Sequence, residues 1–254
     1  MNEESPNGKL DGLRIATTRE HAGVLDDLLS AEGADVRHIP LIRIVGAADE
    51  SGLQAALQRI KEYAWLVLTS TNALHLTMAA GGQAVMAAES LAVACVGETT
   101  AAEAAELGLQ VSLVPERQHV KGLIEAFAAL ERRDVRVLYP RSEIAPSTLK
   151  EGLQALGFLV DDPVAYRTLP DDHGMKQLKD QLDELHAIAF ASPSAVENAW
   201  SAVGDDLRNV HIYTIGPSTS AAVRAHGLTV QREAAVHRAE ALGEIIIRCE
   251  CHHD

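Results

Sequence analysis

The sequence predicts an α/β protein built from doubly wound parallel sheets. Three observations support this fold class. Short apolar runs typical of buried strands alternate with helical stretches along nearly the whole chain. Four glycines stand between a helical stretch and a further strand-like run. Finally, three segments of the first half recur in the second half in the same order.

The expected strands are the apolar runs, taken in chain order: 13–18, 64–69, 91–96, 135–140, 187–192 and 211–216. The four glycines occur in "AEGADV", "ELGLQV", "ALGFLV" and "AHGLTV", as Gly33, Gly108, Gly157 and Gly227. Glycine is favoured where a helix ends in a left-handed residue. We therefore expect each of them to end a helix, with a strand starting within about two residues.

The duplication is visible in three aligned pairs of segments. "WLVLTSTNAL" matches "AIAFASPSAV", which aligns Ser70 with Ser192 at an offset of 122 (192 − 70). "ACVGETTAAEAAELGLQV" matches "YTIGPSTSAAVRAHGLTV" at an offset of 119, and "LRIATTREHA" matches "VRVLYPRSEI", which aligns Arg19 with Arg141 at 122. Each copy supplies about five strands and five helices, enough for one flavodoxin-like domain.

Composition limits the classes of function. The chain has 254 residues, 47% of them hydrophobic and 23% charged, as expected for folded domains with aliphatic cores. A formal charge of −14 disfavours nucleic acid as a partner. No apolar run approaches the roughly 18 to 20 residues of a membrane span. The polar, acidic start "MNEESPNGKL" does not resemble a signal peptide, so we expect a cytoplasmic protein.

The cysteines predict neither disulfides nor a metal centre. Three cysteines are too few and too unevenly spaced for a disulfide framework. The tail "RCECHHD" places Cys249, Cys251, His252 and His253 together, but it lacks the second half of a zinc-binding pattern. We therefore expect no metal.

An ordered set of segments resembles the uroporphyrinogen-III synthase family. The segments are "ATTRE", "HIPLIRI", "LVLTSTNAL", "CVGETTA", "VLYPRSE", "VAYRT", "FASPSAVE" and "TIGPSTSAA". The resemblance implies two flavodoxin-like domains joined by a two-stranded antiparallel connector. The connector strands would be 38–44 and 163–169, one domain 1–38 plus 170–254, and the other 44–162.

The reaction implied by the resemblance closes hydroxymethylbilane, a linear tetrapyrrole with eight carboxylate arms, into a ring with inversion of the last pyrrole. It requires no cofactor and no metal. Tyr166 in "VAYRT" aligns with the tyrosine that the family regards as its best candidate for assisting departure of the hydroxyl. Its alternative role is that of a packed connector residue. The expected partners are this small-molecule substrate and, transiently, the hydroxymethylbilane synthase that hands it over.

Hydroxyl side chains are expected at the turns that join strands to helices. Backbone amides at a helix start attract anions, and nearby hydroxyls can add hydrogen bonds to substrate carboxylates. The same residue types also cap helices, which is the competing interpretation for each of them. The residues are Ser70, Thr71, Thr99, Thr100, Ser192, Ser194, Ser218 and Thr219.

Two arginines occupy equivalent places after the first strand of each copy. Arg19 in "TTRE" and Arg141 in "YPRSE" could pair with substrate carboxylates, or instead with the neighbouring Glu20 and Glu143. One departure from the family concerns the turn that carries Thr71. Many relatives have proline and then a basic residue there, which leaves any cation of this turn in doubt.

The sequence is also compatible with two other functions and disfavours a third. A non-catalytic two-domain binding protein for a small anion would carry the same turns, and a regulatory protein could keep the fold without activity. A nucleotide- or flavin-dependent enzyme is disfavoured, because neither a glycine-rich dinucleotide motif nor a P-loop lysine follows any strand. Formation of the inverted ring from hydroxymethylbilane distinguishes the enzyme from all three.

Overall fold

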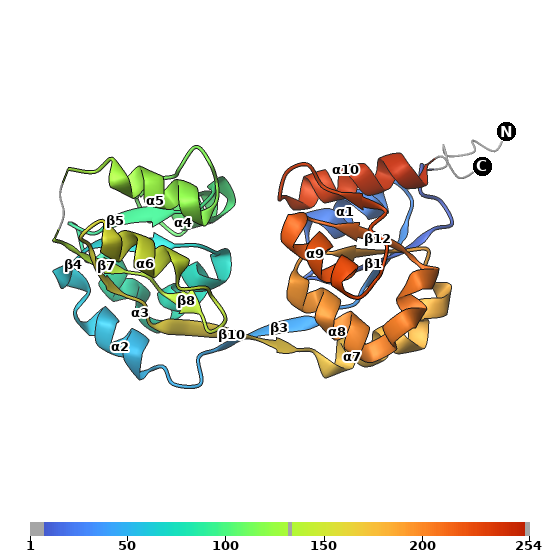
Figure 1. Cartoon of the computed structure of the whole chain (residues 1–254), viewed down its shortest axis with the longest axis horizontal. Helices are drawn as coiled ribbons and strands as arrows, with labels where there is room; N and C mark the ends of the chain where they lie inside the picture. Colours follow the sequence, from blue (N-terminus) through green and yellow to red (C-terminus); the bar gives the residue numbers. More distant parts are fainter. Residues whose placement is uncertain (1–7, 132–133, 252–254) are drawn as a thin grey trace. The chain divides into compact units, whose positions relative to one another are not determined.

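The structure is a computed structural model that describes residues 8–131 and 134–251. The chain forms two compact units. Unit 1 contains Met1–Arg43 and Leu169–Asp254, and unit 2 contains Ile44–Thr168. In each unit the helices lie on both faces of a sheet (Figure 1).

Unit 1 is built on a parallel sheet with the strand order β13-β12-β11-β1-β2. Its strands are β1 (Arg14–Thr17), β2 (Asp35–His38), β11 (Ala187–Phe190), β12 (His211–Thr214) and β13 (Arg232–Glu233). Its helices are α1 (Val24–Ala31), α7 (Asp172–Gln181), α8 (Pro193–Val203), α9 (Pro217–Ala225) and α10 (Ala239–Glu250), with short 3-10 turns at Leu182–Glu184 and Gly204–Asn209.

Unit 2 is built on a parallel sheet with the strand order β6-β5-β4-β7-β9. Its strands are β4 (Tyr63–Leu68), β5 (Ala92–Cys95), β6 (Val111–Leu113), β7 (Arg136–Leu138) and β9 (Leu159–Asp161). Its helices are α2 (Ser51–Gln58), α3 (Thr71–Met86), α4 (Glu98–Glu106), α5 (Val120–Ala128) and α6 (Thr148–Ala155), with a 3-10 turn at Ile60–Glu62.

The two sheets arrange their duplicated strands in the same spatial order. β11, β12 and β1 of unit 1 correspond to β4, β5 and β7 of unit 2, as the aligned segments predict. The chain, however, enters the two sheets at different strands. Numbered along the chain, unit 1 has the flavodoxin order 2-1-3-4-5, whereas unit 2 has the order 3-2-1-4-5. The same sheet is therefore assembled from a discontinuous segment in unit 1 and a continuous one in unit 2.

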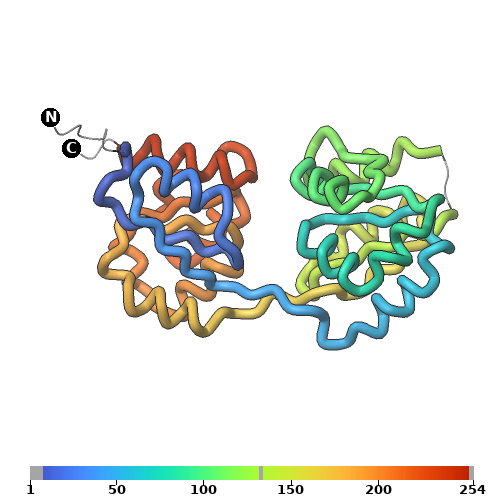
Figure 2. The backbone as a smooth tube through the Cα atoms, turned by 180° about the vertical axis from the view of Figure 1, so that it is seen from behind, coloured from blue at the N-terminus to red at the C-terminus, as the bar shows by residue number. Residues whose placement is uncertain are grey.

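Each sheet has an apolar core on both faces. In unit 2, side chains of α2, α3 and α4 pack on one face and those of α5 and α6 on the other. In unit 1, α7, α8 and α9 cover one face, while α1 and α10 cover the other. Figure 2, viewed from behind, shows the N-terminal and C-terminal parts of the chain together in unit 1, where α1 packs against α10.

The connector segments form a small sheet of their own, in the order β3-β10-β8. β3 (Ile42–Gly46) and β10 (Val164–Pro170) are antiparallel, because Ala47 N donates to Ala165 O while Asp171 N donates to Leu41 O. β8 (Arg141–Ser142) adds a short parallel strand to β10. The connector thus has three strands within the described chain, where two were expected, because the turn after β7 folds onto β10.

The glycines at the helix ends behave as predicted, with one difference. Gly33, Gly108, Gly157 and Gly227 all have positive φ, between 68° and 92°. A strand follows the first three within about two or three residues, but β13 starts only at Arg232. Leu228 is buried in the core first, and the ladder to β12 begins when Gln231 N donates to Ile212 O. The expected strand directly after Gly227 is therefore displaced along the chain.

The segment that leaves β2 is held in unit 1 by the start of α7 and by a side chain from the middle of α8. Leu41 O accepts hydrogen bonds from Asp171 N at 3.2 Å and from Asn198 Nδ2 at 2.7 Å. Asp171 also caps α7 by accepting from Gly174 N. A Cβ atom on Gly174 would lie 1.7 Å from Pro40 O, so only glycine allows this approach of backbone to backbone.

Candidate active site

Several of the predicted site residues lie where the strand order of each sheet reverses. Ligands of parallel α/β sheets bind beyond the carboxyl ends of the strands at this reversal. It falls between β4 and β7 in unit 2 and between β11 and β1 in unit 1. Ser70 and Arg141 follow the first pair of strands, and Ser192 and Arg19 follow the second. The equivalent residues thus occupy equivalent places in both units.

Tyr166 lies at the reversal point of unit 2. Its side chain is 9% exposed, and its hydroxyl is 3.0 Å from Ser70 Oγ across a separation of 96 residues. Ser70 Oγ also accepts from Ala73 N at 3.1 Å and so caps α3. The structure therefore shows Ser70 as a helix cap, and the same oxygen also contacts the predicted catalytic tyrosine.

Ser192, the equivalent serine of unit 1, makes only the capping hydrogen bond with its side chain among the described residues. Ser192 Oγ accepts from Ala195 N at 3.2 Å at the start of α8. Thr71 and Ser194 lie in the first turns of α3 and α8, and both are half-buried. These hydroxyls are placed at helix starts, as predicted.

The turns after β5 and β12, which the duplication aligns, each present one hydroxyl outward and bury the next one. Thr99 and Ser218 are the second residues of α4 and α9, and both are exposed. Thr100 and Thr219, which follow them, are buried at 5% and 0% exposure. Burial prevents the side chains of Thr100 and Thr219 from touching a ligand in this structure. The predicted contact with substrate is therefore not supported for these two side chains.

The duplication extends beyond the aligned segments. A Cβ on Gly97 would lie 3.0 Å from Gln118 Oε1, and a Cβ on Gly216 would lie 2.9 Å from His237 Cδ2. The two contacting residues are offset by 119 (237 − 118), the same as the glycines. The turn after β5 thus packs against the turn that precedes α5, and the turn after β12 packs against the turn that precedes α10. Sequence comparison missed this pair, because glutamine and histidine share no obvious similarity.

The two arginines have different surroundings. Arg19 is exposed, and no ion pair joins it to another residue in 8–131 or 134–251. Arg141 Nε pairs with Asp162 at 2.8 Å, and its Nη1 donates to the carbonyls of Ser142 and Glu143. Arg141 therefore has a structural partner, although not the predicted Glu143 carboxylate.

Asp162 also forms an ion pair with a second cation, Lys150. Lys150 Nζ lies 2.8 Å from its other carboxylate oxygen. Burial raises the pKa of Asp162, but hydrogen bonds from Lys150 and Arg141 outweigh burial and hold the pKa below its usual value. Asp162 thus remains ionised and fixes Arg141 beside β10.

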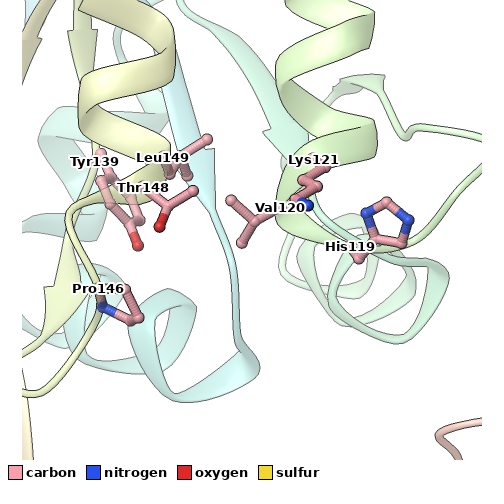
Figure 3. Close-up of a pocket in the computed structure, with 7 residues that line it drawn as sticks. All are labelled: His119, Val120, Lys121, Tyr139, Pro146, Thr148 and Leu149. Carbon is pink, nitrogen blue, oxygen red and sulfur yellow. The ribbon is translucent and has the colours of Figure 1, made fainter.

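A pocket that sequence reasoning did not identify lies beside these residues, wholly within unit 2. It has a volume of about 480 Å³. Figure 3 shows Val120 at the start of α5 across from Thr148 and Leu149 at the start of α6, with Tyr139 beside Thr148. Lys121, His119 and Pro146 complete the lining. Only the fold could reveal this site, since its residues are separated in sequence.

Tyr139 connects the pocket to the tyrosine site. It directly follows β7 and is 3% exposed. It lies close enough to Tyr166 and Arg141 to interact with them electrostatically. Burial raises the pKa of Tyr139, and a hydrogen bond with Thr69 opposes the rise. Tyr139 thus lines the pocket and also lies near Tyr166.

Within the described part of the chain, no three His, Cys, Asp or Glu side chains are grouped to hold a metal ion. The three cysteines are free. His252 and His253, named with the cysteine tail, lie outside the described residues. No helix in the described ranges has the length and apolar character needed to cross a membrane.

Comparison with known proteins identifies related sequences. The family model described as "Uroporphyrinogen-III synthase HemD" matches residues 23–244. A protein of Methanothermobacter thermautotrophicus, provisionally named uroporphyrinogen-III synthase, is 31% identical over 229 residues, which cover 85% of this chain and 90% of that one. The uroporphyrinogen-III synthase of Synechococcus elongatus is 28% identical over 229 residues, covering 83% and 85%.

Solved structures share the fold. The uroporphyrinogen-III synthetase of Helicobacter pylori has a TM-score of 0.64 at 17% identity, covering 93% of this chain and 99% of that one. A mutant uroporphyrinogen III synthase from Thermus thermophilus has a TM-score of 0.62 at 19% identity, covering 93% and 98%. At these identities the likeness establishes the fold.

Proposed function

Because the chain belongs to the uroporphyrinogen-III synthase family, we propose that Tyr166 is the residue that assists ring closure. The protein is a cyclising lyase of tetrapyrrole biosynthesis. It closes hydroxymethylbilane to uroporphyrinogen III with inversion of the terminal ring and loss of water. The family match and the names of the relatives favour this enzyme over a non-catalytic binding protein.

The contact between Ser70 and Tyr166 is the observation that supports the role of the tyrosine. Ser70 Oγ already accepts a hydrogen bond from Ala73 N, so its own proton is available for the Tyr166 oxygen 3.0 Å away. With Ser70 as donor, the phenol proton of Tyr166 is free for the hydroxyl that leaves the substrate. A hydrogen bond donated to the phenol oxygen also disperses negative charge that develops there.

Ring closure requires little more of the Tyr166 phenol than this hydrogen bond. The hydroxymethyl carbon loses its oxygen as water once that oxygen receives a proton, and the electrons of the adjacent pyrrole stabilise the cation left behind. A phenol is a weak acid, but a hydrogen bond from it to the leaving oxygen is effective where water is excluded. The substrate supplies both the electrophile and the nucleophile, so positioning is the main task of the protein.

We propose that exposed hydroxyls and one cation beyond the carboxyl ends of the strands hold the carboxylate arms. Arg19, Thr99 and Ser218 are exposed, and both hydroxyls stand in the first turn of a helix. Amides and the positive end of the helix dipole favour an anion there. Thr71 at the start of α3, and Ser192 and Ser194 at the start of α8, contribute in the same way.

A cytoplasmic location and a transient hand-over from hydroxymethylbilane synthase complete the proposal. The substrate closes spontaneously to the uninverted ring, so a short path between the two enzymes would preserve it. The test compares the share of inverted product when both enzymes are present together with the share when free hydroxymethylbilane is supplied to this protein at the same rate, and hand-over predicts the larger share for the first case.

The decisive experiment for the function itself is a coupled assay with freshly generated hydroxymethylbilane. We expect the purified protein to form the type III ring much faster than the spontaneous reaction forms type I. Separation of the two isomers by chromatography measures both rates. Type I alone, at the rate without protein, would disprove the enzymatic function.

Ser70→Ala tests whether the serine acts through Tyr166. We expect turnover to fall about tenfold, because Tyr166 loses its donor, and the free energy of unfolding to fall by about 1 kcal/mol with the lost cap. Ser70→Thr keeps a hydroxyl and should restore most of the turnover. Rates of type III formation and urea unfolding measure the two effects separately.

Asp171→Ala is the matched control for the lost cap. It removes a side-chain hydrogen bond to the third amide of α7, as Ser70→Ala does at α3. Its unfolding free energy should fall by a similar amount while turnover is retained. Equal turnover of Ser70→Ala and Asp171→Ala would show that Ser70 only caps its helix.

A further inference from the structure

We propose that the pocket between the starts of α5 and α6 binds one pyrrole ring of the linear tetrapyrrole, with Lys121 pairing with a carboxylate arm of that ring. This proposal rests on the proposed function, since it names the part of the substrate that occupies a site next to Tyr166. The pocket residues are His119, Val120, Lys121, Tyr139, Pro146, Thr148 and Leu149.

The walls of the pocket suit a flat apolar ring. Val120, Pro146 and Leu149 line it with carbon, and Tyr139 adds an aromatic ring at its base. Pockets for small ligands typically have volumes of roughly 300–1,000 Å³ and combine such walls with few polar groups. At about 480 Å³ the pocket has room for one substituted pyrrole, whereas a four-ring chain must extend beyond it.

The charge at the pocket is opposite to that of the protein as a whole. The chain carries −14, yet the described lining has no acidic side chain and includes Lys121. Lys121 is exposed, and no ion pair links it to any described residue. An unpaired cation in an otherwise acidic protein favours an anionic ligand, and each pyrrole of the substrate carries two carboxylates.

The start of α6 adds to this preference. Ser147 makes no side-chain cap at the start of α6, so the first amides of that helix have no side-chain partner. Thr148, the first residue of α6, contributes a hydroxyl to the lining. These groups offer hydrogen bonds to a carboxylate that Lys121 attracts.

The duplication gives an internal comparison. Glu240 of α10 takes the place of Lys121 at the repeat offset of 119 (240 − 121). The first turn of the equivalent helix in unit 1 is therefore acidic, and a carboxylate is disfavoured there. The two units therefore differ at this position, and the charge favours binding of the pyrrole ring and its carboxylates in unit 2.

The experiment uses a monopyrrole that carries one acetate and one propionate arm as the probe. Its binding to the isotope-labelled full chain is followed by NMR at the amides of Val120, Lys121, Thr148 and Leu149. We expect saturable shifts at these amides, and a Kd about fivefold higher for Lys121→Gln. Acetate alone should bind much more weakly, because it cannot fill the apolar part of the pocket.

Two further variants act as controls. Lys61→Gln removes the charge of an exposed lysine before β4, at the opposite end of the sheet, and should leave the Kd unchanged. Thr148→Phe places a ring in the pocket at an exposed position and should abolish the shifts while the protein stays folded. With hydroxymethylbilane, Lys121→Gln should raise KM about fivefold and leave kcat for the type III ring unchanged.

The proposal is overturned if the shifts lie elsewhere, if acetate binds as tightly as the monopyrrole, or if Lys121→Gln changes neither Kd nor KM. These outcomes are separate from failure of the proposed function. A wild-type protein that binds the probe in the pocket but forms no type III ring would retain the pocket and lose the function. Normal turnover without binding of the probe at the pocket would retain the proposed function and overturn the pocket proposal.

Discussion

Tyr166→Phe is expected to lower the rate of type III formation about a hundredfold, the lower end of what a positioned acid group contributes. The variant keeps the ring that packs beside β10 and loses only the hydroxyl that meets Ser70. The leaving oxygen of the substrate then has no donor, whereas binding of the carboxylate arms is unaffected. We therefore expect kcat to fall while KM changes little, as measured in the coupled assay with separation of type III from type I.

Tyr63→Phe is the matched control. Tyr63 is a buried tyrosine at the start of β4 in the same unit, and its hydroxyl donates to the Asp161 carboxylate at 2.6 Å. This variant should lose about 1 kcal/mol of stability and retain its turnover. Unchanged type III formation by Tyr166→Phe would remove Tyr166 from the mechanism.

Gly174→Ala is expected to reduce the free energy of unfolding of unit 1 by about 3 kcal/mol, the upper end of the usual cost of overpacking. The new Cβ would lie 1.7 Å from Pro40 O, which is backbone and cannot turn aside. The start of α7 must move away, and the hydrogen bond from Asp171 N to Leu41 O is strained with it.

The position of the tryptophans makes this measurement specific. Trp200 lies in α8 of unit 1 and Trp65 in β4 of unit 2, so a Trp65→Phe background reports urea unfolding of unit 1 by fluorescence. Gly52→Ala is the control, because its Cβ would meet Pro163 at an ordinary 3.6 Å. Coincident unfolding curves for Gly174→Ala and its background would contradict the predicted clash.

Local signals were sufficient to predict the parallel sheets and the positions of their central strands. Glycine after a helix has one dominant physical reason, and Gly33, Gly108 and Gly157 have the expected positive φ. The strand runs are equally clear, since apolar residues must be buried on both faces of a parallel sheet. β8 was not predictable, because a two-residue strand exists only through its pairing with β10.

The site was predictable only in part. Placement of Ser70 and Arg141 follows from the topology of a parallel sheet, whereas the contact of Ser70 with Tyr166 depends on residues 96 positions apart. Burial of Thr100 and Thr219 could not be read from a turn that looks uniformly polar. Lys121 was missed because a free lysine and a paired one look the same in a sequence.

The pairing of β3 with β10 also has a consequence for synthesis on the ribosome. Unit 2 is continuous, so it can fold before β11 has been made, while β1 waits for a partner 172 residues away (187 − 15). Once unit 2 has folded, the hydrogen bond from Ala47 N to Ala165 O holds its two ends together. The entropy of closing the long loop is then already lost, and β1 meets β11 as though the two were near neighbours in the chain.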